Sequence, residues 1–522
     1  MAQKSLRVLL VEVPAVALEL DGEILGEVTL NHAKYTQLLL AANLSSDSEG
    51  GLQFAVQIVD LKSSQPAQMT WSRMIPYCGR ELGVWRIGAP NEILGQYLGN
   101  ADIVGISANF TFERNSAAET ISFVKSRCSA MIVVGGHDAT AAPRYYLERG
   151  ADVCVLGEGE SAILEIASAK VRGGLENVRG IAYLDRGELR KNGKRSRHDL
   201  NSIRYPTEAL LLSHRFDECP DGRVPSNVSA TFSVLETSRG CDEKCSFCDS
   251  SYIVGSYRYA HIEVLQRQLE TLKCAGIRTV LFADDNLLYR TLLSYGGSSG
   301  RQELLQLFDL LFEMGFAWTF YNGIQFGLLE KRGKLDGELI SALFRSAIVD
   351  GTLAGCFRAY IPLEKFIQDE MLLLPKLKPL DVEKEILTAI SRCGVPELNL
   401  GFIIGTPRET AASLAETLKG AEEFGSVVEK ASAGRSVPRF FPWCSIPLPG
   451  TPDHRYFSRN ILYPDSEFPE IFNNYTSPLR SGAFSPLDFT LERSRLSKVL
   501  NRGRLELRAP TMPRGERLAV PA

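Results

Sequence analysis

The sequence predicts an α/β protein: a doubly wound, Rossmann-like domain, then a partial barrel of six β/α units, then a small C-terminal cap. Short apolar runs alternate with helix-like stretches in both halves of the chain, and a loop with three cysteines follows the first apolar run of the second half. Strands that alternate with helices form parallel sheets. With 522 residues, the chain is too long for one ordinary core. We expect domains at residues 1–175 and 228–452, a hairpin and linker at 176–227, and a cap at 453–522.

The first half contains five apolar runs, as expected for buried parallel strands. They are residues 6–14, 54–61, 103–110, 131–136 and 153–156, and helix-like stretches such as 115–126 and 160–171 lie between them. Ligands of doubly wound domains bind at the carboxyl ends of the strands. The residues that follow each run are therefore the candidates for ligand contacts.

Three of these strand ends are rich in glycine and small hydroxyl residues: residues 105–112, 135–140 and 156–160. Such residues let a large planar ligand approach the backbone. No G-x-G-x-x-G motif follows the first run and the chain has no Walker A lysine, which argues against a nicotinamide or nucleotide site. For any one of these loops taken alone, tight turns are the better explanation of the glycines. Three such loops in register weaken that explanation.

The linker region begins with a hairpin. Residues 178–191 read as two short strands joined by the turn Asp185-Arg186-Gly187. The basic stretch 191–197 and a proline- and aspartate-bearing segment follow, and we place the domain boundary there.

The second half contains six further strand-like runs with amphipathic stretches between them. The strands are expected at residues 231–235, 279–283, 318–322, 356–361, 398–404 and 439–444. The helices are expected at residues 261–274, 301–315, 337–351, 381–394 and 410–425. The last four each end on glycine, which is the expected C-cap signal. A full barrel has eight units, so six predict a partial, open one with its chemistry at the carboxyl ends of the strands.

The loop after the first of these six strands carries Cys241, Cys245 and Cys248. Three soft thiolates on a short loop suit an iron–sulfur cluster in which one iron stays open to a ligand. A zinc site would need a fourth ligand, and the nearby sequence offers only the distant His261. A redox C-x-x-C pair would leave Cys241 unexplained.

The pattern Cys-x-x-x-Cys-x-aromatic-Cys after the first strand of a β/α barrel closely resembles the radical S-adenosylmethionine superfamily, over residues 228–452. The resemblance implies a 4Fe–4S cluster on the three cysteines. It also implies S-adenosylmethionine bound by the strand-end residues Phe247, Asp284, Asp285, Glu364, Gly401, Ile403 and Gly405.

The first half resembles the cobalamin-binding domain found ahead of many radical S-adenosylmethionine enzymes, over about residues 6–170. The resemblance implies that cobalamin binds at Ser107, Asn109, Gly135, Gly136, His137, Gly157, Glu158 and Gly159. The Asp-x-His-x-x-Gly segment of cobalamin-dependent methionine synthases is absent from the sequence, so we expect no histidine from the protein below the cobalt.

Together the two resemblances imply a cobalamin-dependent radical S-adenosylmethionine methyltransferase. It would move a methyl group from S-adenosylmethionine via methylcobalamin to an unactivated carbon, or phosphorus, of a small molecule or peptide. One alternative uses the same cofactors for cyclisation or ring rearrangement. Another is a non-catalytic iron–sulfur electron carrier or sensor. The sequence assigns no acid or base, no substrate and no oligomeric state.

Composition limits the partners. The net charge is −4, with 44% hydrophobic and 23% charged residues, which argues against a nucleic-acid surface. The sequence shows no apolar run long enough to span a bilayer and no signal peptide, so we expect a cytoplasmic protein without a membrane partner. The chemistry implied above requires an external one-electron reductant such as a flavodoxin or ferredoxin.

The cysteines at positions 78, 128, 154, 274, 356, 393 and 444 are expected to be small core residues, whereas Cys219 falls in a polar turn. Aromatic and amide residues at the later strand ends could line a substrate pocket or fill the core: Phe320, Tyr321, Gln325, Phe440, Phe441 and Trp443.

Overall fold

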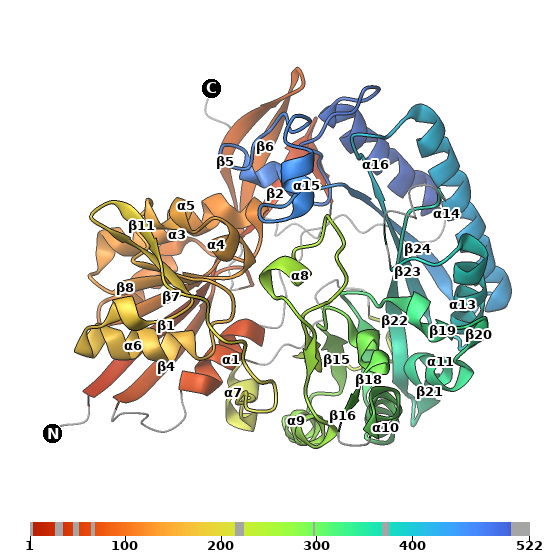
Figure 1. Ribbon diagram of the computed structural model, residues 1–522, viewed down its shortest axis with the longest axis horizontal. Coiled ribbons are helices and arrows are strands. Elements are labelled where there is room, and N and C mark those ends of the chain that lie inside the picture. The colour runs from red at the N-terminus through yellow and green to blue at the C-terminus, as the bar shows by residue number, and fades with distance from the viewer. Residues whose placement is uncertain are drawn as a thin grey trace.

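The structure is a computed structural model that describes residues 4–26, 35–44, 52–63, 68–214, 224–295, 298–367, 374 and 376–502. Two sheet-based halves lie side by side, the N-terminal half in red to yellow and the C-terminal half in green to blue (Figure 1). Cys219 and the last residues of the predicted cap, 503–522, fall outside the described residues.

The first half is built on a seven-stranded sheet with the order β11-β10-β9-β8-β7-β1-β4. Its five parallel strands are the five predicted ones. Numbered by their place in the chain, they lie across the sheet in the order second, first, third, fourth, fifth. This order reverses between β1 and β7, which is the topological switch point of such a sheet. The strands are β1 (Lys4–Glu12), β4 (Leu52–Asp60), β7 (Ile103–Ser107), β8 (Met131–Gly135) and β9 (Val153–Val155).

Helices cover both faces of this sheet, as the doubly wound prediction requires. Alternate residues of β1 enter two separate cores: Leu9 and Val11 pack on one face with α3, while Val8 and Leu10 pack on the other with α1 and α6. The helices are α1 (Tyr35–Leu44), α2 (Gly95–Leu98), α3 (Arg114–Arg127), α4 (His137–Ala141), α5 (Pro143–Leu147) and α6 (Ala162–Arg172).

The predicted hairpin is present as β10 (Ile181–Asp185) and β11 (Glu188–Lys191). It does not stand apart, because β10 pairs antiparallel with β9 and extends the first sheet. The first sheet thus continues to residue 191. After it the chain forms the short helix α7 (Glu208–Ser213), whose N-cap Thr207 accepts a hydrogen bond from the backbone N–H of Leu210.

Sequence reasoning missed a four-stranded antiparallel sheet in the first half. It has the order β3-β2-β6-β5 and lies at the top of Figure 1 beside α15. Its core includes Ile471 and Leu487 of the C-terminal extension, so two distant parts of the chain stabilise each other. The strands are β2 (Ala15–Leu20), β3 (Glu23–Leu25), β5 (Gln68–Tyr77) and β6 (Arg80–Gly88).

The second half is the predicted open barrel. Six parallel strands follow the order β12-β15-β18-β22-β23-β24, and within the described residues β12 and β24 do not pair to close it. The strands are β12 (Phe232–Leu235), β15 (Thr279–Phe282), β18 (Ala317–Phe320), β22 (Thr352–Glu364), β23 (Glu397–Ile404) and β24 (Val437–Cys444). Six two-residue strands pair antiparallel: β13 (Ser238–Arg239) with β14 (Arg258–Tyr259), β16 (Ser294–Tyr295) with β17 (Ser298–Ser299), and β19 (Glu330–Lys331) with β20 (Lys334–Leu335).

Helices cover the outer face of this sheet: α9 (Ile262–Cys274), α10 (Gly300–Glu313), α11 (Gly337–Phe344), α13 (Leu380–Arg392) and α14 (Ala411–Ala431). The glycine signal locates the ends of α10 and α13, where Gly315 and Gly394 have positive φ. It is wrong for the other two. Gly351 instead turns the chain between β21 (Ser346–Val349) and β22. Gly425 lies inside α14, where a Cβ would meet the Phe440 ring at 2.6 Å.

The C-terminal extension forms α15 (Pro452–Tyr456) and α16 (Pro486–Leu500). A capping box between Ser485 and Asp488 fixes the start of α16. At its end, Asn501 hydrogen-bonds the Phe440 backbone of β24 in both directions. The extension therefore closes one side of the barrel.

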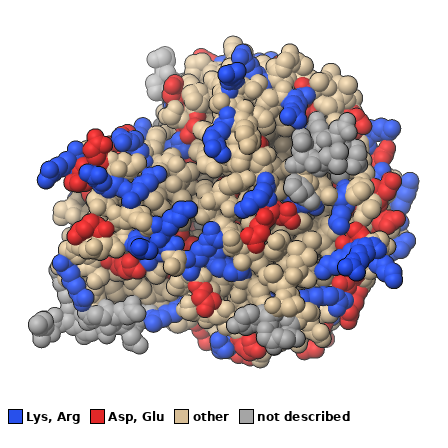
Figure 2. Space-filling view, viewed as in Figure 1, with Lys and Arg blue, Asp and Glu red and all other residues tan. Residues whose placement is uncertain are grey.

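The predicted burial of cysteines is confirmed for Cys154, Cys356 and Cys444, whereas Cys274 is exposed at the end of α9. On the face shown in Figure 2, Lys and Arg side chains are interspersed with Asp and Glu over both halves. Among the described residues, no helix combines the length and apolar character needed to cross a bilayer.

Candidate functional site

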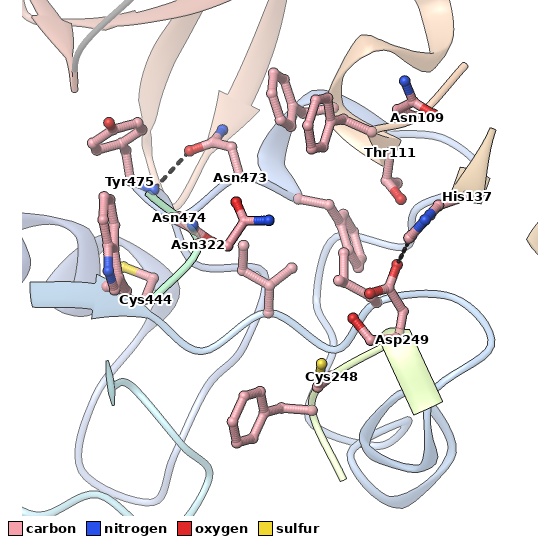
Figure 3. A pocket seen from close by; sticks show the side chains of 18 of the residues that line it. Asn109, Thr111, His137, Cys248, Asp249, Asn322, Cys444, Asn473, Asn474 and Tyr475 are labelled. Atoms are coloured by element: carbon pink, nitrogen blue, oxygen red, sulfur yellow. Dashed lines mark hydrogen bonds and ion pairs between the residues drawn. The ribbon is translucent and has the colours of Figure 1, made fainter. Parts of the chain in front are cut away.

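A large cavity of about 1400 Å³ lies between the two halves. It is lined by residues that follow β1 and β7, by the cysteine loop, by the inner faces of β22, β23 and β24, and by residues 472–475 of the C-terminal extension. The first of these walls contains the switch point, where doubly wound sheets bind ligands. The carboxyl ends of the barrel strands face the same space, so the two predicted ligand-binding edges meet in one cavity (Figure 3).

The cysteine loop runs from β13 (Ser238–Arg239) to α8 (Ser250–Ile253). Gly240 opens it with a φ of +84°, and a Cβ there would lie 2.5 Å from the carbonyl oxygens of Gly255 and Ser256. The backbone N–H of Cys241 donates to the Gly255 carbonyl at 2.9 Å. Only glycine allows the two chain segments to approach this closely.

Burial raises the pKa of all three loop thiols, that of Cys245 to about 12. Thiols in such surroundings stay protonated until a metal displaces the proton. Three cysteines on one loop are the donor set that iron–sulfur clusters use. Within the described part of the chain, no three His, Cys, Asp or Glu side chains converge on a single ion. A cluster does not need this convergence, because each thiolate binds a different iron atom.

Asp284 and Asp285 both support the loop, in different ways. Asp284 is buried outside the cavity lining and accepts hydrogen bonds from the hydroxyls of Thr237 and Ser238 at 2.6 and 2.5 Å; burial raises its pKa to about 6. Asp285 lines the cavity and accepts from the backbone N–H of Gly240 at 2.6 Å. The structure thus brings Asp285, and not Asp284, to the cavity.

Glu364 and Phe247 lie at the cavity, joined by a lysine that sequence reasoning missed. The Lys376 ammonium pairs with Glu364 at 2.5 Å and lies 5.5 Å from the centre of the Phe247 ring. Its positive charge also lowers the pKa values of Cys245 and Cys248, against the larger effect of burial. Lys376 comes from a stretch without helix or strand periodicity, so the sequence carries no signal for it.

The fifth-strand residues separate into two groups. Ile403 lines the cavity. Gly401 makes room for a neighbour, because a Cβ there would lie 1.7 Å from the Tyr360 hydroxyl oxygen. Gly405 has a φ of +82°, and its N–H donates to Glu409 at 3.1 Å. Gly401 therefore leaves space for the Tyr360 side chain, which lines the cavity.

On the wall of the first sheet, Asn109 and His137 reach the cavity. The ring of His137 contacts the Asp249 carboxylate at 2.7 Å, directly beside Cys248 (Figure 3). Burial lowers the pKa of His137, but Asp249 reverses this and the net shift is upward. His137 thus connects the first domain to the cysteine loop.

The remaining predicted residues of this wall lie outside the cavity lining. Ser107 accepts a hydrogen bond from Gln37 at 2.8 Å. Gly136 has a φ of +126°, and a Cβ there would lie 2.5 Å from the carbonyl oxygen of Ala108 in the loop after β7. Gly135 is the last residue of β8.

The loop with Gly157, Glu158 and Gly159 turns toward the barrel domain and away from the cavity lining. Glu158 pairs with Arg258 and, at 3.4 Å, with Arg239, two residues before Cys241. Its neighbour Glu160 pairs with Arg239 at 2.8 Å. This loop is an ionic contact between the domains, so only Asn109 and His137 of the eight predicted cobalamin residues line the cavity.

Several cavity residues went unrecognised in the sequence. Phe110, half exposed at 52%, stacks on Phe112 with ring centres 5.4 Å apart, directly at the switch point. Asn473, Asn474 and Tyr475 enter from the C-terminal extension (Figure 3). An apolar residue just past a strand end was the available signal for Phe110; the extension offered none.

The aromatic residues predicted as pocket or core residues fall into both groups. Phe320, Tyr321, Phe441 and Trp443 line the cavity, whereas Phe440 packs in the barrel core. Gln325 donates to Glu243 at 3.0 Å and accepts from Asn286 at 2.7 Å, which tethers the cysteine loop.

Comparisons with known proteins match this architecture. Residues 96–167 match the family model described as B12 binding domain. An uncharacterized methyltransferase of Pyrococcus horikoshii is 31% identical over 35% of this chain and 39% of its own length. The cytidylyl-2-hydroxyethylphosphonate methyltransferase of Streptomyces wedmorensis is 24% identical over 59% of this chain and 58% of its own length. The chain thus spans less than two thirds of the length of either curated relative.

Two solved structures share the arrangement of both halves. The radical S-adenosylmethionine methyltransferase TsrM of Kitasatospora setae superposes with a TM-score of 0.59 and 16% identity, over 87% of this chain and 75% of that one. The cobalamin-dependent S-adenosylmethionine radical enzyme OxsB gives 0.66 and 17%, over 94% and 66%. This chain has the fold of cobalamin-dependent radical S-adenosylmethionine enzymes. The predicted fold class is confirmed, including the order of its two domains.

Proposed function

We propose that the protein is a cobalamin-dependent radical S-adenosylmethionine methyltransferase. The observation that carries the proposal is the shared cavity, in which the switch point of the first sheet faces the three-cysteine loop of the barrel. The likeness to TsrM and OxsB, both determined with cobalamin, supports it. Cys241, Cys245 and Cys248 would hold a 4Fe–4S cluster, and the loop after β7, with Asn109 and Phe110, would face cobalamin.

When bound, these groups supply one-electron cleavage of S-adenosylmethionine and a transferable methyl group. The chain's own residues provide the site around them. Asp285 holds Gly240 and so fixes the start of the cysteine loop. Asn286 donates to the Cys241 sulfur at 3.5 Å. Lys376 and Glu364 place a charge pair beside Phe247, where S-adenosylmethionine would lie. Phe441 and Trp443 of β24 line the cavity, where their rings would limit the access of water to the bound groups.

The test is anaerobic reconstitution with iron, sulfide and hydroxocobalamin, followed by visible absorbance, EPR and metal analysis. We expect a cluster signal and retained corrinoid in the full chain. Cys245→Ala should lose the cluster, whereas the control Cys393→Ala, which changes a half-buried cysteine beside α13, should keep it. A cluster without retained corrinoid would contradict the cobalamin part of the proposal.

Turnover separates methyl transfer from the alternatives. With reductant, labelled S-adenosylmethionine and a panel of small acids and peptides, a methyltransferase gives labelled product. Deoxyadenosine without any methylated product would favour the cyclase or ring-rearranging enzyme, and failure to bind S-adenosylmethionine would favour an electron carrier. We also propose a cytoplasmic protein that takes electrons from an external one-electron donor such as a flavodoxin or ferredoxin.

A further inference from the structure

The cysteine loop reaches the protein surface outside the cavity. Lys244, which lies between Cys241 and Cys245, is exposed and is not among the residues that line the cavity. Its neighbour Glu243 accepts a hydrogen bond from the Gln325 side chain at 3.0 Å and does not line the cavity either. A partner therefore has access to this part of the loop from solvent, without entering the cavity.

The hairpin of β19 and β20 lies beside this exposed part of the loop. Gln325 is the N-cap of the 3₁₀ helix η6 (Phe326–Leu329), which runs directly into β19 and so joins the hairpin to the loop. The Lys331 ammonium donates to the Thr291 carbonyl at 3.3 Å, at the end of the 3₁₀ helix η5 (Leu287–Leu292). The hairpin is thus attached to both η5 and η6.

Tyr289 of η5 lies next to the loop itself. Its ring centre is 5.2 Å from that of Tyr257, whose backbone N–H donates to the Asp242 carboxylate at 3.4 Å. Burial raises the pKa of Tyr289, and the nearby charges of Asp242 and Cys241 add to that rise. The loop, η5 and the hairpin therefore form one continuous stretch of the protein.

The hairpin concentrates positive charge. Its exposed cations are Lys331, Arg332 and Lys334. Lys331 and Lys334 stand directly opposite one another in the strand register, and like charges in that position destabilise a strand pair. Because the arrangement costs the hairpin stability, its cations call for a reason other than folding.

No carboxylate forms an ion pair with these three cations among the described residues. The Lys331 ammonium donates to a neutral carbonyl. Carboxylates next to the hairpin pair with other cations: Glu330 with Lys378 at 3.1 Å, and Asp336 with Arg301 at 2.6 Å. The hairpin therefore presents its positive charge to solvent.

Two exposed leucines accompany the cations. Leu292, the last residue of η5, is 49% exposed, and Leu335, the last residue of β20, is 36% exposed. Apolar side chains among charged ones are the composition of a protein–protein contact and not of a site for a small ion. We call Leu292, Lys331, Arg332, Lys334 and Leu335 the hairpin patch.

We propose that the hairpin patch is the docking surface for the external electron donor, an acidic one-electron carrier protein. Carboxylates of the donor pair with the hairpin cations, which steers its approach and fixes its orientation beside the cysteine loop. The reduced donor gives up one electron and is oxidised, and the oxidised cluster gains that electron. The inference rests on the proposed function, because it requires a cluster on the cysteine loop.

Stopped-flow absorbance of the reconstituted full-length protein tests the proposal. The probe is flavodoxin hydroquinone, an acidic flavin protein, and the variant is the double substitution Arg332→Glu, Lys334→Glu. We expect cluster reduction by flavodoxin to slow about tenfold or more at low ionic strength, because steering changes association rates by about 10- to 1000-fold. The difference should largely disappear at about 0.5 M salt, where charges are screened within a few ångströms.

Three controls separate docking from other effects. Dithionite, a small reductant that needs no docking surface, should reduce the double variant and the wild type at similar rates. Lys194→Glu makes the same change of charge at an exposed lysine beyond β11 of the first half, and it should leave the rate unchanged. The charge-conserving double substitution Arg332→Lys, Lys334→Arg should restore the wild-type rate. A wild-type rate with flavodoxin in the charge-reversed variant would overturn the inference, as would an equal loss in Lys194→Glu.

A binding measurement distinguishes this inference from the proposed function. Flavodoxin affinity for the protein before reconstitution, measured by biolayer interferometry, does not depend on a cluster and should weaken about tenfold in the charge-reversed variant. Equal affinity for variant and wild type would overturn the inference while the proposed function stands. Slower reduction by dithionite as well would mean that the hairpin supports the cluster and not the donor. If the wild type loads no cluster, the proposed function fails whatever flavodoxin binding shows.

Discussion

The two walls that face each other across the cavity are built in different ways. The cysteine loop is held along its length by side chains from nearby strand ends: Asp285 on Gly240, Asn286 on Cys241 and Gln325 on Glu243. The wall of the first sheet presents Phe110 and Asn109 at a switch point, and its glycine loops mostly contact protein. A small cluster needs fixed ligands, whereas a large planar ligand needs an open edge. The comparison predicts how each wall responds to change.

The largest effect is expected from Gly240→Ala. The new Cβ would lie 2.5 Å from two carbonyl oxygens, and the positive φ costs about 1–3 kcal/mol for a residue other than glycine. The loop must move, so we expect loss of the cluster, measured by iron content and visible absorbance. The control is Gly337→Ala, where a Cβ meets nothing within 4 Å. A normally loaded Gly240→Ala cluster would mean that the loop is not rigidly held.

The second-largest effect is expected on the pH dependence of the free energy of unfolding. Burial raises the pKa of Asp284 to about 6, from an ordinary value of 3.8. In the unfolded chain the Asp284 carboxyl ionises at a lower pH than it does in the folded protein. It therefore lowers the free energy of unfolding as the pH rises from about 4 to about 6, by about 3 kcal/mol in total. In Asp284→Asn, urea unfolding should show a correspondingly smaller fall over this range. An unchanged pH profile would show that Asp284 is ionised in the fold.

The third effect concerns the wall of the first sheet. Phe110→Ala removes an exposed stacking surface at the switch point, and we expect corrinoid to bind up to about tenfold more weakly. Glu158→Gln should change corrinoid affinity less, because Glu158 contacts Arg239 and Arg258 outside the cavity lining. The surface control is Ile348→Ala in β21. A larger loss of corrinoid affinity in Glu158→Gln than in Phe110→Ala would mean that corrinoid contacts the Glu158 loop and not Phe110.

The smallest effect is expected from Lys376→Met. Lys376 lies beside Phe247 and the loop thiols, and its charge favours the more negative, reduced state of a cluster. Its removal should shift the midpoint potential to a more negative value, on the order of tens of millivolts for an interaction of about 1 kcal/mol. Lys384→Met, on a surface pair with Glu423, is the control. A midpoint potential unchanged from that of the wild type would place the lysine outside the cluster's field.

The fold and the cysteine loop were predictable because their signals are local. Apolar runs of strand length identified all eleven parallel strands, and three cysteines within eight residues must share a loop whatever surrounds them. The glycine stop signals worked where glycine is the C′ residue, at Gly315 and Gly394. They failed at Gly425, where glycine is needed for helix packing against Phe440 and not for a turn.

The rest of the site depends on contacts between distant parts of the chain. The direction of Glu158 is set by Arg239 and Arg258, which lie 81 and 100 positions later, and no local pattern reports that pairing. Lys376 reaches the cysteine loop across the barrel mouth. The antiparallel sheet of β2, β3, β5 and β6 was missed because its core is completed by Ile471 and Leu487.

The central claim is that one cavity brings a cluster and a corrinoid together, and EPR of the reconstituted protein tests it most directly. With cobalt in the cob(II)alamin state, the account predicts that its signal broadens when the cluster is reduced, through coupling between two neighbouring spins. The broadening should be absent in Cys245→Ala, which retains corrinoid but has no cluster. A cobalt signal that is identical in the wild type and in Cys245→Ala under the same reduction would contradict the shared cavity.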